Sequence, residues 1–445
     1  MSPSNQPVQT SLRREAGLFQ VVAYGIGNIV GAGIYVLVGD AAGLAGGLLW
    51  LAFLAGAVIA LFSGLSYAEL SSMYPRAASE YIYVGRAYGS RLLSFLTEWI
   101  MLITELVAAA AVSIGFAGYF SSIFSVPELP VAFSLLVVLT IVAVGGVGGS
   151  FRLNTVLSMV AIGGLLIVIG AGLDRFGTVS YTYSPNGLSG VLGAAVLVFF
   201  AFIGFDNMSN ISEETKRPEK TIPRGLLITV TVTTVAYGLV GLAVVSLVPW
   251  RELSTSVAPL AYAVSVDLGP TAYGLLSIIA LLTTLNTVLV LLIVSSRIIY
   301  GMGREGALPA VLGRLNKRTS TPIVASLIAL LVALAFLPLG KIDVVAKITS
   351  FGSLLTFTLV NLSLLHLRRV APHISRPFKT PLSVKWISIT ALLGMISCIV
   401  MLTQFDSLSV GLGLLLPVSG AIVYSLMGGR MTTRTDRALH QQHEK

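Results

Sequence analysis

The chain has 445 residues, of which 55% are hydrophobic and only 11% are charged, and its mean hydropathy is +0.89. Soluble domains carry about 25% charged residues, so this composition excludes an ordinary soluble protein. The net charge of +9 does not indicate nucleic-acid binding, because lysine and arginine gather in the cytoplasmic loops of membrane proteins.

Apolar stretches long enough to cross a bilayer recur along almost the whole chain. They predict an all-α integral membrane protein with twelve transmembrane helices, near residues 17–39, 43–71, 91–120, 130–149, 153–173, 188–211, 222–249, 271–301, 322–339, 345–366, 386–404 and 408–427. The first stretch has no small-residue cleavage site, so we interpret it as a retained helix rather than a signal peptide. No loop is long enough to hold a separate soluble domain.

The distribution of basic residues predicts the orientation in the cell membrane. Lysine and arginine are frequent in the loops around 216–224, 304–318 and 368–385, all on one side of a twelve-helix arrangement. The opposite loops carry few basic residues. We therefore expect both terminal tails, 1–16 and 428–445, to be cytoplasmic.

The first predicted helix contains the glycine-rich run "GIGNIVGAGIYVLVG" at residues 25–39. Glycine costs about 1 kcal/mol relative to alanine inside a helix, so this run predicts an interruption. Within a membrane, a helix breaks only where the freed backbone is buried in protein or lines a cavity. The backbone amides near Ala32 and Gly33 would then open a second half-helix, whose end attracts anions. The alternative is close helix packing through small residues.

A second interruption is predicted in "FFAFIGFDNMSNISEETKRPEKTIPRG", where Gly204 lies within the sixth helix and Asp206 follows. Each interruption falls in the first helix of a five-helix block. Paired interruptions at corresponding positions indicate the binding site of an inverted-repeat transporter. We therefore expect a first repeat at 17–175, a second at 188–366, and two added helices at 386–427.

These motifs resemble those of the amino acid–polyamine–organocation (APC) superfamily of transporters. "SSRIIYGMGREGALP" at 295–309 and "RPFKTP" at 376–381 are also similar to loops of that superfamily, in the same order and spacing. The resemblance implies a five-plus-five inverted repeat with helices 1 and 6 broken. It also implies secondary transport of amino acids or related amines.

The resemblance further implies which residues would bind the substrate. Backbone and small side chains at the first break would hold a carboxylate, carbonyl groups at the two breaks would accept from an amino group, and an aromatic ring would cover the ligand. The matching residues are Gly31, Ala32 and Gly33 for the carboxylate, Ile29, Phe200 and Ile203 for the amino group, and Phe200 or its neighbour Phe202 for the cover.

Two acidic residues inside predicted helices are candidates for coupling or gating. A mid-membrane carboxylate is costly unless it is paired or protonated. Asp206 would carry a proton or gate the site, or else stabilise the helix locally. Glu105 would bind a cationic substrate end or carry a proton, or else pair with a basic residue or reach a water-filled vestibule. Glu98, nearer the cytoplasmic end, is expected to be structural.

The coupling ion is left open between three possibilities. The helix-5 lysine that some proton-coupled relatives use has no counterpart, because residues 153–173 contain no lysine or arginine. A sodium site would use carbonyl groups of Gly27 and Val30 with hydroxyls of Thr283 and Thr284, although membrane threonines often bond within their own helix. We expect proton coupling through Glu105 or Asp206 first, uncoupled or exchange transport second, and sodium coupling last.

The leading hypothesis is a secondary amino acid permease that works by alternating access. A polyamine or organic-amine transporter, or an amino acid exchanger, on the same fold is the alternative. A receptor without turnover is a remote alternative, and no residue cluster favours an enzyme. We expect a small-molecule substrate and the lipid bilayer as partners, with no nucleic acid, metal or cofactor besides the coupling ion; the oligomeric state is open.

Overall fold

The apolar runs fold as helices because a helix satisfies its backbone hydrogen bonds internally, as lipid requires. The computed structural model describes residues 14–427, apart from 146, 257, 317 and 340–341. The helices are α1 Leu18–Ile29, α2 Ala32–Ala45, α3 Leu49–Met73, α4 Ser79–Tyr88, α5 Arg91–Phe124, α6 Glu128–Val144, α7 Val147–Gly172, α8 Gly187–Phe199, α9 Asn207–Asn210, α10 Pro218–Leu247, α11 Trp250–Leu253, α12 Pro259–Leu268, α13 Pro270–Arg304, α14 Ile323–Phe336, α15 Ile342–Val370, α16 Ile389–Leu402 and α17 Ser407–Met427.

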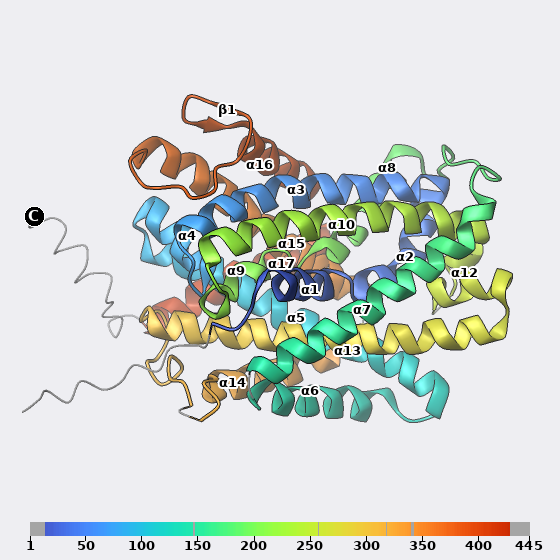
Figure 1. Cartoon of the computed structure of the whole chain (residues 1–445), viewed down its shortest axis with the longest axis horizontal. Helices are drawn as coiled ribbons and strands as arrows, with labels where there is room; N and C mark the ends of the chain where they lie inside the picture. The colour runs from blue at the N-terminus through green and yellow to red at the C-terminus, as the bar shows by residue number, and fades with distance from the viewer. Residues whose placement is uncertain (1–13, 146, 257, 317, 340–341, 428–445) are drawn as a thin grey trace, which may run out of the picture.

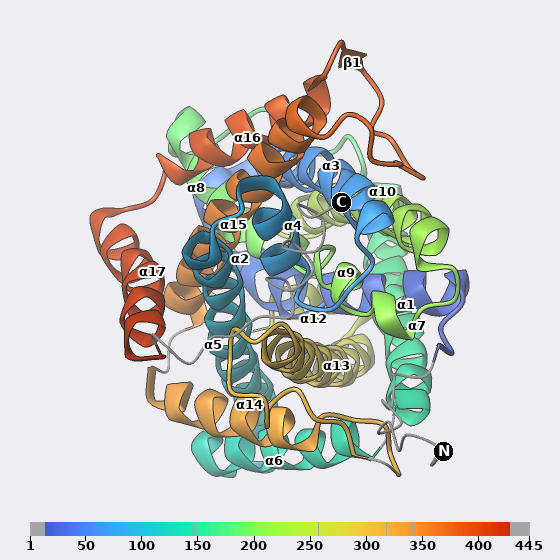
Figure 2. The same ribbon diagram turned by 90° about the vertical axis from the view of Figure 1, so that its left-hand side faces the viewer.

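Most of the long helices run along the long axis of the molecule, as Figure 1 shows. Figure 2 looks along this axis and shows α13 end-on inside a ring of other helices. Helices α6 and α14 pack side by side at one edge, and α17 packs against α5 and α15. The short hairpin of β1 (Ser383–Val384) and β2 (Ile387–Ser388) lies at the same end of the bundle as α4. We call this end the α4 end, and the opposite end the α12 end.

Eight described segments are long and apolar enough to cross a membrane, and the first of them, Leu18–Met73, contains α1 to α3. Shorter apolar helices are α6, α12, α14 and α16. The protein is therefore a multi-pass membrane protein. Helices α4, α11 and α12 were not expected from the sequence, because each is ten residues or shorter and lies in a predicted loop.

Both predicted interruptions are present as helix breaks. Helix α1 ends at Ile29 and α2 begins at Ala32. Helix α8 ends at Phe199, a 3-10 turn covers 200–202, and α9 begins at Asn207. Gly204, between them, has a φ of +121°, a conformation that other residues rarely adopt.

The N-terminal side of α1 is attached to the loop after α9. The amide of Ala16 donates to the carbonyl of Glu214 over 3.1 Å, and the amide of Lys216 donates to the carbonyl of Ala16 over 2.8 Å. This pairing fixes the start of α1 against the segment that follows the second break. The rest of the predicted N-terminal tail, 1–13, and the whole C-terminal tail, 428–445, lie outside the described residues.

Candidate functional site

A pocket lies where the two helix breaks meet. The first break and its flanks contribute backbone, the second break contributes apolar side chains, and helices α5, α9, α13 and α15 complete the wall. Its lining residues are Asn28, Ile29, Gly31, Ala32, Gly33, Glu105, Ala108, Phe200, Ile203, Gly204, Asn207, Thr287, Leu291 and Thr349. Every predicted substrate residue except Phe202 is among them.

The first break presents the amino-terminal end of α2 to the pocket. The amides of the first residues of a helix have no carbonyl partner inside that helix, and they carry a partial positive charge. In α2 these are the amides of Ala32 and Gly33. Gly31 lies directly against Thr287, so that a β-carbon on Gly31 would overlap the threonine hydroxyl. At the first break, the wall of the pocket is therefore formed largely by backbone.

The two breaks are joined by hydrogen bonds from polar side chains. The hydroxyl of Tyr237 on α10 contacts the carbonyl oxygens of Ile29 (2.8 Å) and Ala201 (3.1 Å). The side-chain amide of Asn28 donates to the carbonyl of Gly204 over 2.9 Å. These contacts fix the position of one helix break relative to the other. Both asparagine and tyrosine were missed from the sequence, because their partners are distant in the chain.

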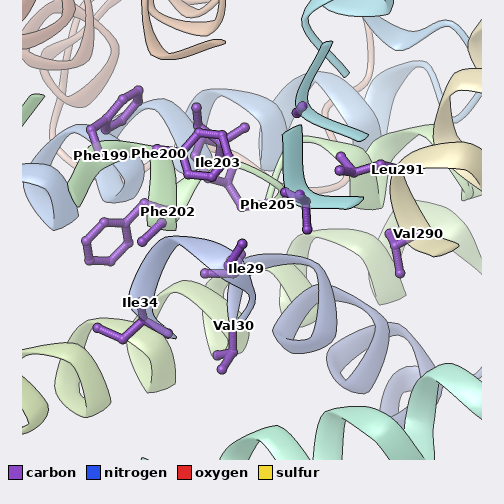
Figure 3. Packing of buried hydrophobic residues seen from close by; sticks show 14 of the residues in the cluster. Ile29, Val30, Ile34, Phe199, Phe200, Phe202, Ile203, Phe205, Val290 and Leu291 are labelled. Carbon is purple, nitrogen blue, oxygen red and sulfur yellow. The ribbon is translucent and has the colours of Figure 1, made fainter. Parts of the chain in front are cut away.

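The aromatic residues of the second break point in different directions, as Figure 3 shows. Phe200 and Ile203 line the pocket on the side of Ile29. Phe202 lies outside the pocket, because its ring packs edge-on against Tyr237 with 5.0 Å between ring centroids. Phe200 is thus the phenylalanine of the second break that lines the pocket, and Phe202 supports the break from outside the pocket.

The two candidate acidic residues are both buried and lie near the start of α9, which Asp206 directly precedes. Oε1 of Glu105 accepts a hydrogen bond from the side-chain amide of Asn207 over 3.1 Å. Oδ1 of Asp206 accepts from the amide of Gly204 over 3.0 Å, and Asp206 does not line the pocket. The other oxygen of each carboxyl group has no hydrogen-bond partner among the described residues. Neither forms an ion pair with a described basic residue. Pairing of Glu105 with a basic residue, one of the alternatives considered from the sequence, is therefore not seen among the described residues.

The residues of the predicted sodium site are engaged in other bonds. The carbonyl of Gly27 accepts from the side-chain amide of Asn286 over 3.1 Å, and Asn154 donates in turn to Asn286 over 3.1 Å. The hydroxyls of Thr283 and Thr284 donate to carbonyl groups one turn earlier in α13. An amide donor therefore contacts Gly27, the position at which a cation was considered. In the sequence, only the presence of Asn154 and Asn286 within apolar helices indicated that such a polar network could form at Gly27.

Buried ion pairs lie toward the α4 end of the molecule. Glu69 on α3 accepts from Nε of Arg368 over 2.9 Å and from the amide of Thr380 over 2.7 Å, and Nε of Arg376 lies 3.3 Å away. Arg297 on α13 pairs with Glu214 over 2.8 Å, and both side chains are buried. These contacts join α3 to α15, and α13 to the segment after α9.

A larger cavity of about 550 Å³ lies toward the α12 end. It is bordered by Gly193, Val196 and Leu197 of α8, just before the 3-10 turn that begins at Phe200, and it reaches the exposed residues Asp40 and Asp406. Across its rim, Lys347 pairs with Asp406 over 3.0 Å. We call this cavity the vestibule; α8 borders it, and the turn that follows α8 carries Phe200 into the central pocket.

Paired broken helices around a central pocket in a multi-pass helical membrane protein are typical of a transporter rather than an enzyme. No group of metal-ligating side chains occurs among the residues that the structure describes. The family described as "Amino acid permease" matches residues 17–424 of the chain. The chain therefore belongs to this amino acid permease family of the APC superfamily.

Several characterised proteins are similar to the chain. A branched-chain amino acid permease of Bacillus subtilis is 31% identical over 396 residues, which cover 84% of this chain and 85% of the permease. A methylthioribose transporter of the same organism is 29% identical, with 85% and 86% covered. Cationic amino acid transporter 4 of Mus musculus is 31% identical, with 81% of this chain and 61% of the longer mouse protein covered.

Proposed function

We propose that this protein is a proton-coupled secondary transporter that moves amino acids across the cell membrane by alternating access. The observation that carries the proposal is the meeting of both helix breaks at one pocket that also contains the buried Glu105. Half-helix ends and exposed backbone at such a point bind the charged groups of a substrate. The family membership supports amino acids as the substrate class.

We infer a five-plus-five inverted repeat followed by two helices. Each break falls in the first helix of a block, α1–α7 and α8–α15. When Leu18–Met73 is taken as two spans and α6, α14 and α16 are added to the other long segments, twelve spans result. Helix α12 has only ten residues and is too short to be one. The excess of basic residues at the α4 end then makes that end cytoplasmic.

The substrate's carboxylate would lie at the amides of Ala32 and Gly33, where the partial charge of the α2 end is positive. Its amino group would face the carbonyl oxygens of Ile29, Phe200 and Ile203. In the described state Ile29 already accepts from Tyr237, so the ammonium would share or replace that contact. Phe200 would close over the ligand from the vestibule side.

The remaining wall supports an aliphatic amino acid as the first candidate. Ala108, Leu291, Phe200 and Ile203 offer apolar surface, which matches the name of the branched-chain permease that is similar to this chain. Glu105 in the same wall favours the second candidate, a cationic amino acid or a polyamine, whose positive end would contact the free carboxylate oxygen.

Proton coupling is supported by the hydrogen bonds at the two candidate sites for a coupling ion, the acidic pair Glu105 and Asp206 and the predicted sodium site at Gly27. Glu105 and Asp206 are buried without an ion pair among the described residues, so each needs a proton, water or a cationic ligand to be stable. In the alternative sodium site, the side-chain amide of Asn286 donates to the carbonyl of Gly27, and the hydroxyl of Thr283 donates to a carbonyl of its own helix. A donor at that carbonyl competes with a cation.

Alternating access is supported by the asymmetry of the two ends. The α4 end is closed by buried arginine–glutamate pairs, whereas a vestibule of about 550 Å³ leads toward Phe200 from the α12 end. The described state would therefore be closed to the cytoplasm. Release there requires that the ion pairs around Glu69 and Glu214 separate.

The deciding experiment is transport into proteoliposomes by wild-type protein and by Glu105→Gln. Leucine, lysine and putrescine are each tested for uptake driven by a pH gradient, with sodium or choline salts, and for counterflow. We expect wild-type uptake to depend on the pH gradient and not on sodium. If Glu105 carries the proton, the variant loses accumulation of every substrate and keeps counterflow.

If Glu105 instead recognises a cationic end, the variant loses lysine or putrescine selectively, by about ten- to a hundredfold in affinity. Sodium-driven uptake by the wild type would contradict proton coupling. Wild-type behaviour of the variant in every assay would remove Glu105 from the functional site.

A further inference from the structure

Six carboxyl groups of the described chain are buried, and they fall into two classes. Glu69 and Glu214 are paired with arginines. The other four form no ion pair with any described residue, and they are Glu80, Glu98, Glu105 and Asp206. Four buried carboxyl groups cannot all be ionised without counter-charges, so this set must hold protons.

Glu80 and Glu98 form a pair at the α4 end that the transport mechanism above does not use. Glu80 accepts from the hydroxyls of Tyr67 (2.8 Å) and Ser79 (2.6 Å). Oε2 of Glu98 accepts from the amide of Tyr81 over 2.7 Å, and its Oε1 has no hydrogen-bond partner among the described residues. The two carboxyl groups interact electrostatically, and burial raises the pKa of Glu80 above that of an ordinary glutamate.

The pair is connected to the pocket by two routes. Along α5, Glu98 and Glu105 are seven residues apart, which places them on one face at about 10 Å along the axis. Across α9, Asn207 bonds to Glu105, and Asn210 at the other end of α9 accepts from the amide of Ser79 over 3.2 Å. The short helix after the second break therefore contacts the pocket at one end and α4 at the other.

Several buried hydroxyl groups lie near Asp206 or Glu80. Tyr67, which donates to Glu80, also interacts electrostatically with Asp206. Tyr83 lies beside Ser79 and Ser209. The hydroxyls of Tyr83 and Ser209 are fully buried and complete no hydrogen bond with a described residue.

We propose that Glu80 and Glu98 form a shared-proton site that receives the transported proton from Asp206 and Glu105 and releases it at the α4 end. The inference rests on the proposed proton coupling. No hydrogen bond joins Asp206 to Tyr67 in the described state, so the carboxyl O–H of Asp206 would give its proton through a bridging water to the hydroxyl oxygen of Tyr67, which would pass its own proton to the carboxylate of Glu80. Asp206 thereby becomes ionised and Glu80 neutral. Glu98 exchanges the proton with Glu80, and water accepts it.

Release follows from the position of α4, which packs on α5 and α15 at the closed end. When this end opens, water reaches the pair and stabilises its ionised form. The other charged or titratable groups around α4 are not ion-paired with Glu80 or Glu98; they are Tyr67, Tyr83, Arg91, Glu305, His366 and Tyr424. Proton loss would thus be tied to the same movement that releases the substrate.

The test measures proton entry into proteoliposomes with an internal pH dye when substrate is added outside, together with substrate counterflow. The variants are Glu80→Gln, Glu98→Gln and the acid-retaining Glu98→Asp, and the control is Glu128→Gln, at an exposed position in α6. We expect both glutamine variants to reduce substrate-driven proton entry about a hundredfold and to keep counterflow. Glu98→Asp and the control should resemble the wild type.

Wild-type proton entry in both glutamine variants would overturn this inference alone, as would loss of counterflow in both. Absence of substrate-driven proton entry in the wild type would overturn the proposed coupling and this inference with it. If the variants do not fold, infrared difference spectra of the wild type decide. A band of protonated carboxyl groups should lose intensity when substrate is added, and a spectrum without that band would contradict the proposal.

Discussion

The side-chain amide of Asn207 donates to Oε1 of Glu105 over 3.1 Å and so joins the helix after the second break to α5. Asn207 is the first residue of α9, and Glu105 is in the middle of α5. Any change in the ionisation of Glu105 changes the strength of this bond, because an ionised acceptor binds a donor more strongly. The bond is therefore a direct link between proton binding and the position of the break.

The first prediction concerns this link. Asn207→Ala removes the donor, and we expect a loss of gradient-driven uptake similar to that of Glu105→Gln. In a double-mutant cycle the two changes should be strongly non-additive, with a coupling of about 1.5–3 kcal/mol in substrate binding. Binding isotherms of the two single variants and the double variant measure it. Additive effects would show that the two residues act separately.

The second prediction concerns the contact between the two breaks at Gly33. A β-carbon on Gly33 would overlap the backbone of Ala201, which cannot move without shifting the second break. Gly33→Ala should therefore lower the melting temperature in detergent as well as abolish transport. The matched control is Gly163→Ala in α7, where nothing lies within 4 Å of the added carbon. That control should be neutral or stabilising by about 0.4–1 kcal/mol.

The third prediction concerns the amide network at Gly27. Asn286→Ala leaves the carbonyl of Gly27 and the amide of Asn154 without these partners, and should destabilise the protein by about 1–3 kcal/mol. The melting temperature of the wild type should be the same in sodium and choline chloride. Asn286→Asp would place an acceptor against the carbonyl and should gain stability from sodium. Sodium stabilisation of the wild type would show that Gly27 belongs to an ion site.

The fourth prediction concerns pH and the rim of the vestibule. The amide of Ser409 and the ammonium of Lys347 lower the pKa of Asp406 to about 2. Because this lies below the ordinary value of about 4, the ionised group stabilises the folded state above pH 4. The contribution should disappear as pH falls from about 4 to about 2. It should remain below about 1 kcal/mol, because the pair is exposed.

Comparing the unfolding of Asp406→Asn with that of the wild type across this range checks the prediction. The two proteins should differ at pH 6 and converge at the acid end. A difference that persists at the lowest pH would mean that the aspartate contributes through its shape rather than its charge.

The helix breaks could be predicted from the sequence because their cause is local. Glycines such as Gly31, Gly33 and Gly204 lower the helix propensity of any segment that contains them. In an apolar run that must cross a membrane, such glycines therefore indicate a helix break. The pocket followed from the same reasoning, because half-helix ends have one established use in transporters. The position of Glu105 in the pocket wall also agrees with its place within an apolar helix.

The partners of these residues could not be predicted in the same way. The bonds from Asn28 to Gly204 and from Tyr237 to Ile29 join residues about 176 and 208 positions apart, and one sequence contains no information about such pairings. Phe202 was placed in the site because three phenylalanines stand together, and only packing against Tyr237 decides which of them turns away. The acid pair in α4 and α5 was missed because a ten-residue helix in a loop has little periodicity.

The carboxylate of Glu69 binds two arginines and a backbone amide at once, and all of its partners belong to α15 or the loop after it. Such a group is costly to bury, so its bonds repay desolvation and leave little net stability. The closed and open forms can therefore be nearly equal in free energy, even though several strong bonds separate them. The bonds must nevertheless be lost before water replaces them. We therefore expect the closed and open forms to be about equally populated at rest but to interconvert with a large activation enthalpy. The turnover rate should then rise steeply with temperature.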